Sequence, residues 1–260
     1  MKSFWMKKIF MKLLLSRRGK LRCPVCNSSV PKFKMIGEEY LRQFEASLFP
    51  HSLFAFETLN ILGYSCPYCD ASDRTRLYKL YFDRYLADNP NNRIDLLDFA
   101  PDPKLTSQLK IKPTVNYRSA DISGNKVDDK VDITAMTAYQ DNSFDFIICS
   151  HVLEHVADDL KAMKELYRVL KPGGKAIVMV PILLTINDID EDEKVVSQTE
   201  RLTRFGQDDH VRLYSKNGFV SRLCKSGFLV NQYGSDFFGV ETFYKHGISE
   251  RSVLYVAEKA

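Results

Sequence analysis

The chain has 260 residues, of which 45% are hydrophobic and 12% aromatic, a composition that supports a full hydrophobic core and argues against disorder throughout. Its formal charge is +4, but residues 1–22 carry eight Lys and Arg and no Asp or Glu, so the other 238 residues carry −4. Because a nucleic-acid-binding domain carries its basic excess on the domain itself, nucleic acid is not the expected partner.

Residues 1–20 are predicted to form a basic amphipathic arm, with apolar side chains at helical spacing at Met6, Ile9, Phe10 and Leu13. Lysines interrupt its apolar runs well before the roughly 18 residues of a spanning helix, and no small-residue cleavage site follows Leu15. We therefore expect a cytoplasmic protein. The arm either lies on an anionic membrane surface or docks on its own chain.

Two cysteine pairs follow the arm, Cys23-Pro-Val-Cys26 and Cys66-Pro-Tyr-Cys69, separated by 39 residues. Four convergent thiolates suit a tetrahedral, structural zinc site. We predict a zinc-binding module over residues 21–75, with a hairpin or short helix near residues 38–49, and a linking helix over 76–92. Cys149 and Cys224, inside apolar segments, are interpreted as buried hydrophobes.

Two other interpretations of the cysteine pairs stay open. The segment "CPYC" is similar to a glutaredoxin active site, although no redox-domain pattern surrounds it and "CPVC" would then have no role. Disulfides would need an oxidising compartment, for which we find no export signal.

From about residue 93, strand-like and helix-like segments alternate, which is typical of an α/β fold with a parallel sheet covered on both faces. Strands are predicted within 93–100, 114–122, 130–136, 141–150, 175–182, 228–234 and 252–259, and helices at 101–111, 158–170 and 215–227. The helix at 158–170 carries one apolar stripe, and the "KPGG" that follows it provides a stop, because Pro172 cannot continue a helix and the glycines permit left-handed backbone angles.

The 41-residue run "DNSFDFIICSHVLEHVADDLKAMKELYRVLKPGGKAIVMVP" closely resembles the core of class I S-adenosylmethionine-dependent methyltransferases of the type-11 kind. With the paired CPxC knuckles, "LDFAPDP", "ADIS", "VDIT" and "FGQDDHVRLYS", residues 21–258 resemble a bacterial subgroup of these enzymes. The resemblance implies a doubly wound, seven-stranded Rossmann-like methyltransferase domain over 93–260, preceded by the small zinc module.

The turn after the first strand, "FAPDP", lacks the glycines that many such enzymes place there. S-adenosylmethionine has no phosphate that must sit against a helix N-terminus, so a glycine-rich cradle is not obligatory. Ala100 is small enough for close approach and Pro101 fixes the turn through its locked φ. A degenerate domain that no longer binds the cofactor is the alternative.

The resemblance also implies the cofactor site. Asp98 would contact the methionine end of the cofactor, next to Phe99, Ala100 and Pro101. Asp121, beside Ile122, would accept both ribose hydroxyls, because a carboxylate offers two oxygens to a diol. Asp132 and Ile133 would flank the adenine, and Ser150 and His151 would line the cleft near the sulfonium. Asp98 and Asp132 could instead be capping or turn acids.

Methyl transfer to a hydroxyl benefits from a general base, and His151 and His210 are the candidates. Asp209 would orient His210, and Arg212 would bind an anionic acceptor. In the alternative, the polar residues of this loop only satisfy one another as a lid. His155 is interpreted as a packing and hydrogen-bonding residue and not as a catalyst. The acidic run at 188–193 is expected to be solvated and mobile.

Three classes of function follow. The first is a methyltransferase acting on a small-molecule or lipid-linked acceptor, for which the resemblance suggests a sugar of a surface polysaccharide. The second is an RNA methyltransferase, against which the charge distribution argues. The third is a non-catalytic zinc-containing binding protein.

Overall fold

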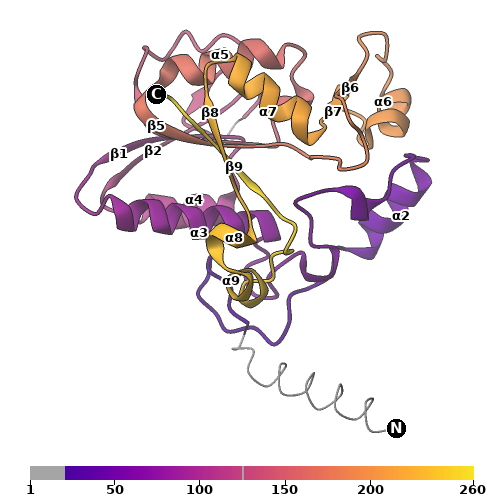
Figure 1. The fold of residues 1–260 in the computed structure, drawn as a ribbon, viewed down its shortest axis with the longest axis horizontal. Helices are drawn as coiled ribbons and strands as arrows, with labels where there is room; N and C mark the ends of the chain where they lie inside the picture. Colours follow the sequence, from indigo (N-terminus) through magenta and orange to yellow (C-terminus); the bar gives the residue numbers. More distant parts are fainter. Residues whose placement is uncertain (1–20, 125) are drawn as a thin grey trace, which may run out of the picture.

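The computed structural model describes residues 21–124 and 126–260, so the predicted basic arm lies outside the described residues (Figure 1). Its centre is a seven-stranded sheet with the order β3-β2-β1-β4-β5-β9-β8. The strands are β1 (Ile94–Phe99), β2 (Val115–Asp121), β3 (Asp129–Lys130), β4 (Phe144–Ser150), β5 (Leu170–Met179), β8 (Leu229–Tyr233) and β9 (Leu254–Glu258). Within this sheet, β9 alone runs in the direction opposite to the other strands. The predicted doubly wound α/β fold is confirmed.

Helices cover both faces of this sheet (Figure 1). α3 (Asp73–Asp88) and α4 (Pro103–Lys110) lie on one face, and α5 (Asp159–Val169) and α7 (Lys216–Lys225) lie on the other. The sheet is therefore covered on both sides, which explains why β1 and β4 are buried at nearly every position and do not alternate between buried and exposed residues. α5 ends at Val169, ahead of Pro172, and Gly173 takes the left-handed angle expected of the "KPGG" turn.

The third predicted strand, 130–136, is wrong in all but its first residue. β3 ends at Lys130, and the chain then turns at Asp132, whose Oδ1 accepts hydrogen bonds from the amide and the hydroxyl of Thr134 at 2.8 and 2.9 Å. Short polar side chains that bond nearby amides compete with sheet pairing in this way. The β-propensity of the segment is thereby overridden.

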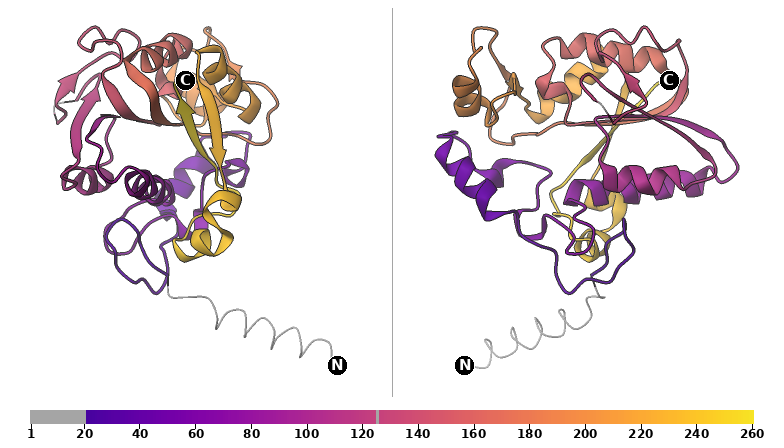
Figure 2. Two further views of the ribbon diagram at one scale, coloured as in Figure 1. Left: turned by 60° about the vertical axis from the view of Figure 1, so that its left-hand side comes forward. Right: turned by 180° about the vertical axis from the view of Figure 1, so that it is seen from behind.

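Residues 21–75 contain α2 (Glu38–Ala46), which confirms a short helix in the predicted insertion, and the 3-10 turns η1 (Leu53–Ala55) and η2 (Ile61–Gly63). This segment lies against the chain that leaves the sheet (Figure 2). The Leu184 amide donates to the Ala55 carbonyl at 2.9 Å, and the Glu57 amide donates to the Ile182 carbonyl at 3.0 Å. The predicted module and domain boundaries stay predictions.

Two short helices, α8 (Ser235–Phe238) and α9 (Val240–Lys245), separate β8 from β9 and pack beside the N-terminal segment (Figure 1). Gly247, just after α9, needs to be glycine, because its φ is +64° and an added Cβ would lie 2.2 Å from the Phe33 ring. The backbone of the C-terminal segment therefore approaches the cysteine segment closely.

Arg76, on α3, joins these parts. Its guanidinium is fully buried and donates to five main-chain carbonyls, those of Gly63, Tyr64, Ala71, His246 and Gly247. It also stacks on the Phe33 ring, 4.0 Å from the ring centroid. All five N–H donors of an arginine are thus used, which is how a buried charge avoids an unpaired donor.

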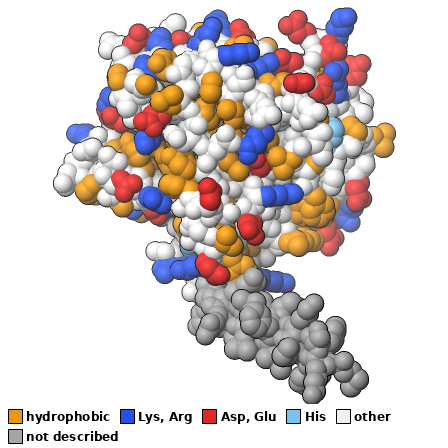
Figure 3. Space-filling view, in the orientation of Figure 1, with side chains coloured by type: hydrophobic (Ala, Val, Ile, Leu, Met, Phe, Trp, Pro, Cys, Tyr) orange, Lys and Arg blue, Asp and Glu red, His pale blue; other side chains and the backbone are white. Residues whose placement is uncertain are grey.

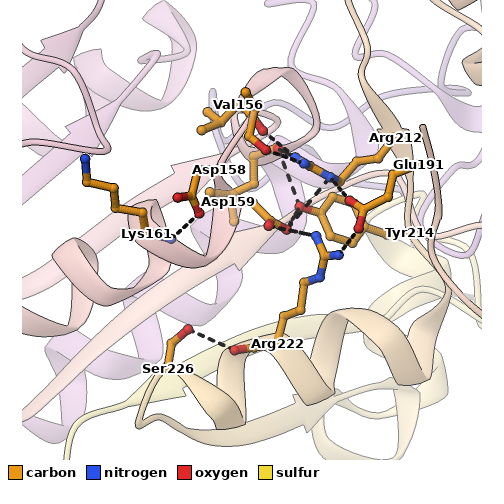
Figure 4. Close-up of polar contacts among 11 residues, drawn as sticks. Val156, Asp158, Asp159, Lys161, Glu191, Arg212, Tyr214, Arg222 and Ser226 are labelled. Atoms are coloured by element: carbon orange, nitrogen blue, oxygen red, sulfur yellow. Dashed lines mark hydrogen bonds and ion pairs between the residues drawn. The ribbon is translucent and has the colours of Figure 1, made fainter. Parts of the chain in front are cut away.

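The acidic run is expected to be solvated and mobile, but its middle residues are paired. Asp190 and Glu191 form β6 (Asp190–Glu191), which pairs with β7 (Arg212–Leu213). Asp190 and Asp192 bind Arg204 of α6 (Gln198–Phe205), and Glu191 binds both Arg212 and Arg222, as Figure 4 shows. Three of the five acids of the run are thus neutralised by cations that lie later in the chain.

Cys149 is buried, as predicted, but Cys224 is exposed, so its prediction is wrong. On α7 the buried positions are Phe219 and Leu223, and Cys224 falls one residue beyond that stripe. None of the helices among the described residues has both the length and the apolar character needed to span a membrane.

Replacing Arg76 with Lys should lower the free energy of unfolding by about 3–5 kcal/mol, because one ammonium cannot satisfy five carbonyls and leaves buried acceptors unpaired. Urea unfolding of the full chain measures this loss. Arg84→Lys, on the exposed side of the same helix, is the matched control and should change stability by less than about 1 kcal/mol. Equal free energies of unfolding for the two variants would show that the hydrogen bonds of Arg76 do not contribute this stability.

Candidate active site

The strand order reverses between β1 and β4, and ligands bind at such a point in open α/β sheets. Phe99 pairs with Cys149 in register, so the residues that follow them emerge side by side. Two of these, Ala100 and His151, have φ of +49° and +57°, left-handed angles that cost an L-residue about 1–2 kcal/mol. Strain of this kind gathers at functional sites, so both residues mark this end of the sheet as the candidate site.

A cavity of about 750 Å³ lies beside the β1 turn and is lined in part by Ala100, Pro101 and Asp121. Asp121 ends β2, and Ser123 donates to its Oδ1 from the amide at 2.8 Å and from the hydroxyl at 3.1 Å. A carboxylate can accept several hydrogen bonds, so Asp121 can also accept hydrogen bonds from a diol placed at the cavity wall. These three predicted cofactor residues therefore lie together around a space that fits a nucleoside.

Asp98 and Phe99 are 2% exposed and lie beneath this cavity, not on its wall. The Tyr117 hydroxyl donates to Asp98 Oδ2 at 2.8 Å, and burial raises the pKa of the Asp98 carboxyl to about 7. Ser150, at the end of β4, shares a 2.8 Å hydrogen bond with the Tyr78 hydroxyl of α3. A direct contact of Asp98 or Ser150 with a cofactor stays a prediction.

The remaining predicted cofactor residues differ in exposure. Asp132 is exposed and forms the turn with Thr134, while Ile133 is 5% exposed and packs in the main core. Ile122, which follows Asp121, is 64% exposed. The segments "DIS" and "DIT" thus make the same aspartate turn after neighbouring strands, and their contact with adenine stays a prediction.

A second cavity, of about 280 Å³, lies between α2, the chain leaving β5 and the loop after α6. Its walls are mainly apolar, with Phe44, Phe56, Ile182 and Phe205 among them, and its polar groups include Arg74, His151 and His210. An apolar pocket with a few convergent polar groups is typical of a small-molecule site. The structure therefore brings both predicted catalytic histidines to one cavity.

His151 lies between a cation and an anion. Its Nε2 is 2.9 Å from Arg74 Nη1, which can only donate, so Nε2 carries the lone pair in this arrangement. Its Nδ1 is 3.1 Å from Glu154 Oε1. Burial, followed by the Arg74 charge, lowers the pKa of His151, so the ring is neutral at neutral pH and can accept a proton.

The Asp209 prediction needs correction. Its Oδ2 lies 3.2 Å from His155 Nδ1, so Asp209 orients His155 and not His210. Burial lowers the pKa of His210, whose ring packs edge-on against His155 with centroids 4.7 Å apart. His155 thus packs against His210 and pairs with Asp209, which fits its interpretation as a packing and hydrogen-bonding residue.

Arg212 does not face an acceptor, so that expectation is also wrong. Its side chain is 5% exposed, and its guanidinium donates to the carbonyls of Leu153, Val156 and Ala157 (Figure 4). These contacts fasten the loop that carries His210 to the segment after β4. Arg212 is thus a structural residue, two residues after the cavity-lining His210 in the sequence.

Our reading of the sequence missed Arg74 and Glu154. Arg74 lies on α3, outside every motif that we singled out, and its partner His151 is 77 residues away, so no local pattern could have identified it. Glu154 had a signal, because it is a charged residue inside the apolar run "VLEHV". It is 1% exposed.

The four predicted zinc ligands converge. Cys23 Sγ lies 3.7 Å from Cys69 Sγ, and Cys26 Sγ lies 3.8 Å from Cys66 Sγ. A tetrahedron with Zn–S arms of about 2.3 Å has edges of about 3.8 Å, whereas a disulfide needs about 2.05 Å. Burial raises the pKa of the Cys26 thiol, but hydrogen bonds with Ser28 and with the neighbouring cysteines Cys69 and Cys23 together lower it to about 7. The cluster is compatible with zinc.

Comparison with known proteins gives first the class of the fold and then a family that part of the chain resembles. A sheet of this order, with the site at the β1–β4 switch, is the Rossmann-like methyltransferase fold. Residues 84–178 match the model of the Methyltransf_11 family, described as a methyltransferase domain. This part of the chain is therefore similar to the methyltransferase domains of that family.

Two curated relatives match parts of the chain. A ubiquinone/menaquinone biosynthesis C-methyltransferase of Haemophilus ducreyi is 49% identical over 41 residues, 16% of each chain. A demethylmenaquinone methyltransferase of Listeria welshimeri is 30% identical over 86 residues, 33% of each. The matches thus span a third or less of these relatives. A solved SAM-dependent methyltransferase of Archaeoglobus fulgidus is 13% identical, with coverage of 71% of this chain and 94% of the other and a TM-score of 0.46.

Ala100→Gly should raise the free energy of unfolding by up to about 1 kcal/mol. Relief of the left-handed strain, about 1–2 kcal/mol, exceeds the added freedom of the unfolded chain, about 0.4–1 kcal/mol. Urea unfolding measures the change. Ala120→Gly, in the extended backbone of β2, is the control and should destabilise; a loss of stability in both variants would contradict the strain at Ala100.

The Asp98 carboxyl should make stability fall as pH rises. Its folded pKa of about 7 exceeds the unfolded value of about 3.9, so the folded state holds the proton more tightly and this contribution is lost progressively between pH 4 and 7. Between pH 5 and 8 the wild type should lose about 2–3 kcal/mol relative to Asp98→Asn. Urea titrations at both pH values test this, and parallel pH profiles would refute it.

Proposed function

We propose that the protein is an S-adenosylmethionine-dependent methyltransferase acting on a small or lipid-linked acceptor, with a sugar of surface polysaccharide synthesis as the favoured class. The observation that carries the proposal is the pairing of two spaces at one end of the sheet. The larger is bordered by Ala100, Pro101 and Asp121, and the smaller by Arg74, His151 and His210. One suits the cofactor and the other suits the acceptor.

When bound, S-adenosylmethionine supplies a methyl group already activated by the positive sulfur, so positioning can provide much of the catalysis. Asp121 would hold the ribose hydroxyls, and the Ala100 turn would let the ligand approach the backbone. The apolar walls of the smaller cavity would exclude water around the acceptor.

His151 is the proposed general base. Its Nε2 lone pair faces Arg74 in the structure, so an acceptor hydroxyl must take the place of that contact before its proton can move to Nε2. An anionic group on the acceptor would draw Arg74 away and free the nitrogen. Arg74 thus couples recognition of acceptor charge to the availability of the base.

We also propose that Cys23, Cys26, Cys66 and Cys69 hold one structural zinc ion. Four thiolates fill the tetrahedral shell and leave no position for substrate. This proposal is supported by the sulfur separations and by the matching left-handed residues, Asn27 and Asp70, that follow each knuckle.

Charge argues against nucleic acid as the acceptor. On the face shown in Figure 3, acidic and basic side chains are interspersed. Residues 23–260 carry a net formal charge of −4. Such a surface gives little of the phosphate attraction on which nucleic-acid affinity depends. The proposal also includes a cytoplasmic location and contact with a membrane surface through residues 1–20. Those residues lie outside the described part of the chain.

Titration calorimetry with S-adenosylmethionine tests the proposal. Wild-type protein should bind the cofactor saturably, and Asp121→Ala should bind about 10–100-fold more weakly, because two hydrogen bonds to a carboxylate are lost. Ser123→Ala keeps the carboxylate and is the matched control, expected within about threefold of wild type. Equal affinity of Asp121→Ala and wild type would refute the ribose assignment.

The same titration separates the classes of function. His151→Gln should retain cofactor affinity within about threefold, while labelled-methyl transfer into fractionated cell extract should fall by about 10²–10⁴-fold. Absence of saturable cofactor binding by zinc-loaded wild type would leave the non-catalytic class. Binding to RNA with a steep salt dependence would favour the RNA methyltransferase.

A further inference from the structure

A second group of metal-ligating side chains lies beside the smaller cavity, away from the cysteines. Glu154, His155 and His210 each present one donor atom, and the three atoms lie within 4.8 Å of one another. Glu154 and His155 come from the 3-10 turn η3 (Leu153–His155) after β4, and His210 comes from the loop before β7. Segments more than 50 residues apart thus converge on one point.

Two buried donor atoms of this group, Glu154 Oε2 and His210 Nδ1, lack partners. Glu154 is 1% exposed, and its Oε1 lies 3.1 Å from His151 Nδ1, while its Oε2 has no hydrogen bond. His210 is 3% exposed, and its Nδ1 has no partner either. A buried charged group without a partner is costly, and binding a cation removes that cost.

The third donor is already oriented. Asp209 Oδ2 lies 3.2 Å from Nδ1 of His155, so the other ring nitrogen, Nε2, is the one left to bind a cation. Histidines that bind metals commonly donate their second ring N–H to a carboxylate in this way. For His210, a hydrogen bond to the backbone of Phe205 leaves Nδ1 as the available nitrogen.

The geometry points to a divalent transition-metal site formed by Glu154, His155 and His210, with Zn²⁺ as the best match. Two imidazoles and one carboxylate form a ligand set that zinc uses at catalytic sites, where a fourth position stays open. Of the three ligands, His210 also lines the smaller cavity, so the site borders the proposed acceptor space. A bound oxygen there would be polarised and its pKa lowered.

This site is separate from the cysteine cluster, and its existence does not depend on methyl transfer. The two metal sites differ in ligand chemistry, since one is built from sulfur alone and the other from nitrogen and oxygen. Only the polarising role rests on the proposed function. The metal content of the protein therefore tests the site itself, whatever the reaction proves to be.

Elemental analysis of the full chain, equilibrated with Zn²⁺ and freed of excess metal, should give two zinc ions per chain. Glu154→Gln and His210→Ala should each give one, and their affinity for the second ion should fall at least about 10–100-fold. His51→Ala removes a histidine outside the cluster and should keep both ions. Cys66→Ser should lose the other ion.

Cobalt substitution provides a second measurement that needs no activity. The cysteine site should show thiolate-to-cobalt charge-transfer absorption, and the second equivalent should add ligand-field bands without it. Glu154→Gln should abolish only that second set, and circular dichroism shows whether the variants fold. One zinc ion per wild-type chain, lost in Cys66→Ser and kept in His210→Ala, would overturn the proposed site.

Discussion

One buried guanidinium sets the relation between the parts of this protein. Arg76 ties the carbonyls of Gly63, Tyr64 and Ala71, which border the second cysteine knuckle, to those of His246 and Gly247 near the C-terminus. Because it sits on α3, the same bonds fix that helix. Without this cation, five acceptors would face one another in an interior that water cannot reach.

The consequence reaches the candidate site through the same helix. Arg74 and Tyr78 are four residues apart and so lie on one face of α3, where they contact His151 and Ser150 at the end of β4. Arg76 projects from another face. The segment holding the cysteine cluster therefore contacts the helix that positions Arg74 against His151, the proposed base.

Much of the fold was predictable because local and global preferences agree. The strands predicted within 93–100 and 141–150 are short, largely apolar segments bounded by turns, and the "KPGG" stop acts through backbone geometry alone. Predictions failed where a distant partner decided the outcome. The acidic run is ordered by Arg204, Arg212 and Arg222, and Arg74 gains its role from a histidine 77 residues away. Sequence spacing carries no information on such contacts.

Several departures from local rules gather at the candidate site, which the sequence could not show. Ala100 and His151 hold left-handed angles, Asp98 is a buried carboxyl, and Glu154 Oε2 and His210 Nδ1 are buried without partners. These residues lie at the ends of β1 and β4 or on the loops packed there, although Leu48 also holds a left-handed angle outside this site. A protein tolerates strain and unpaired groups where a ligand compensates for them. The glycine-poor turn at Ala100 thus fits a binding site better than a degenerate remnant, since a remnant would have no reason to keep the strain.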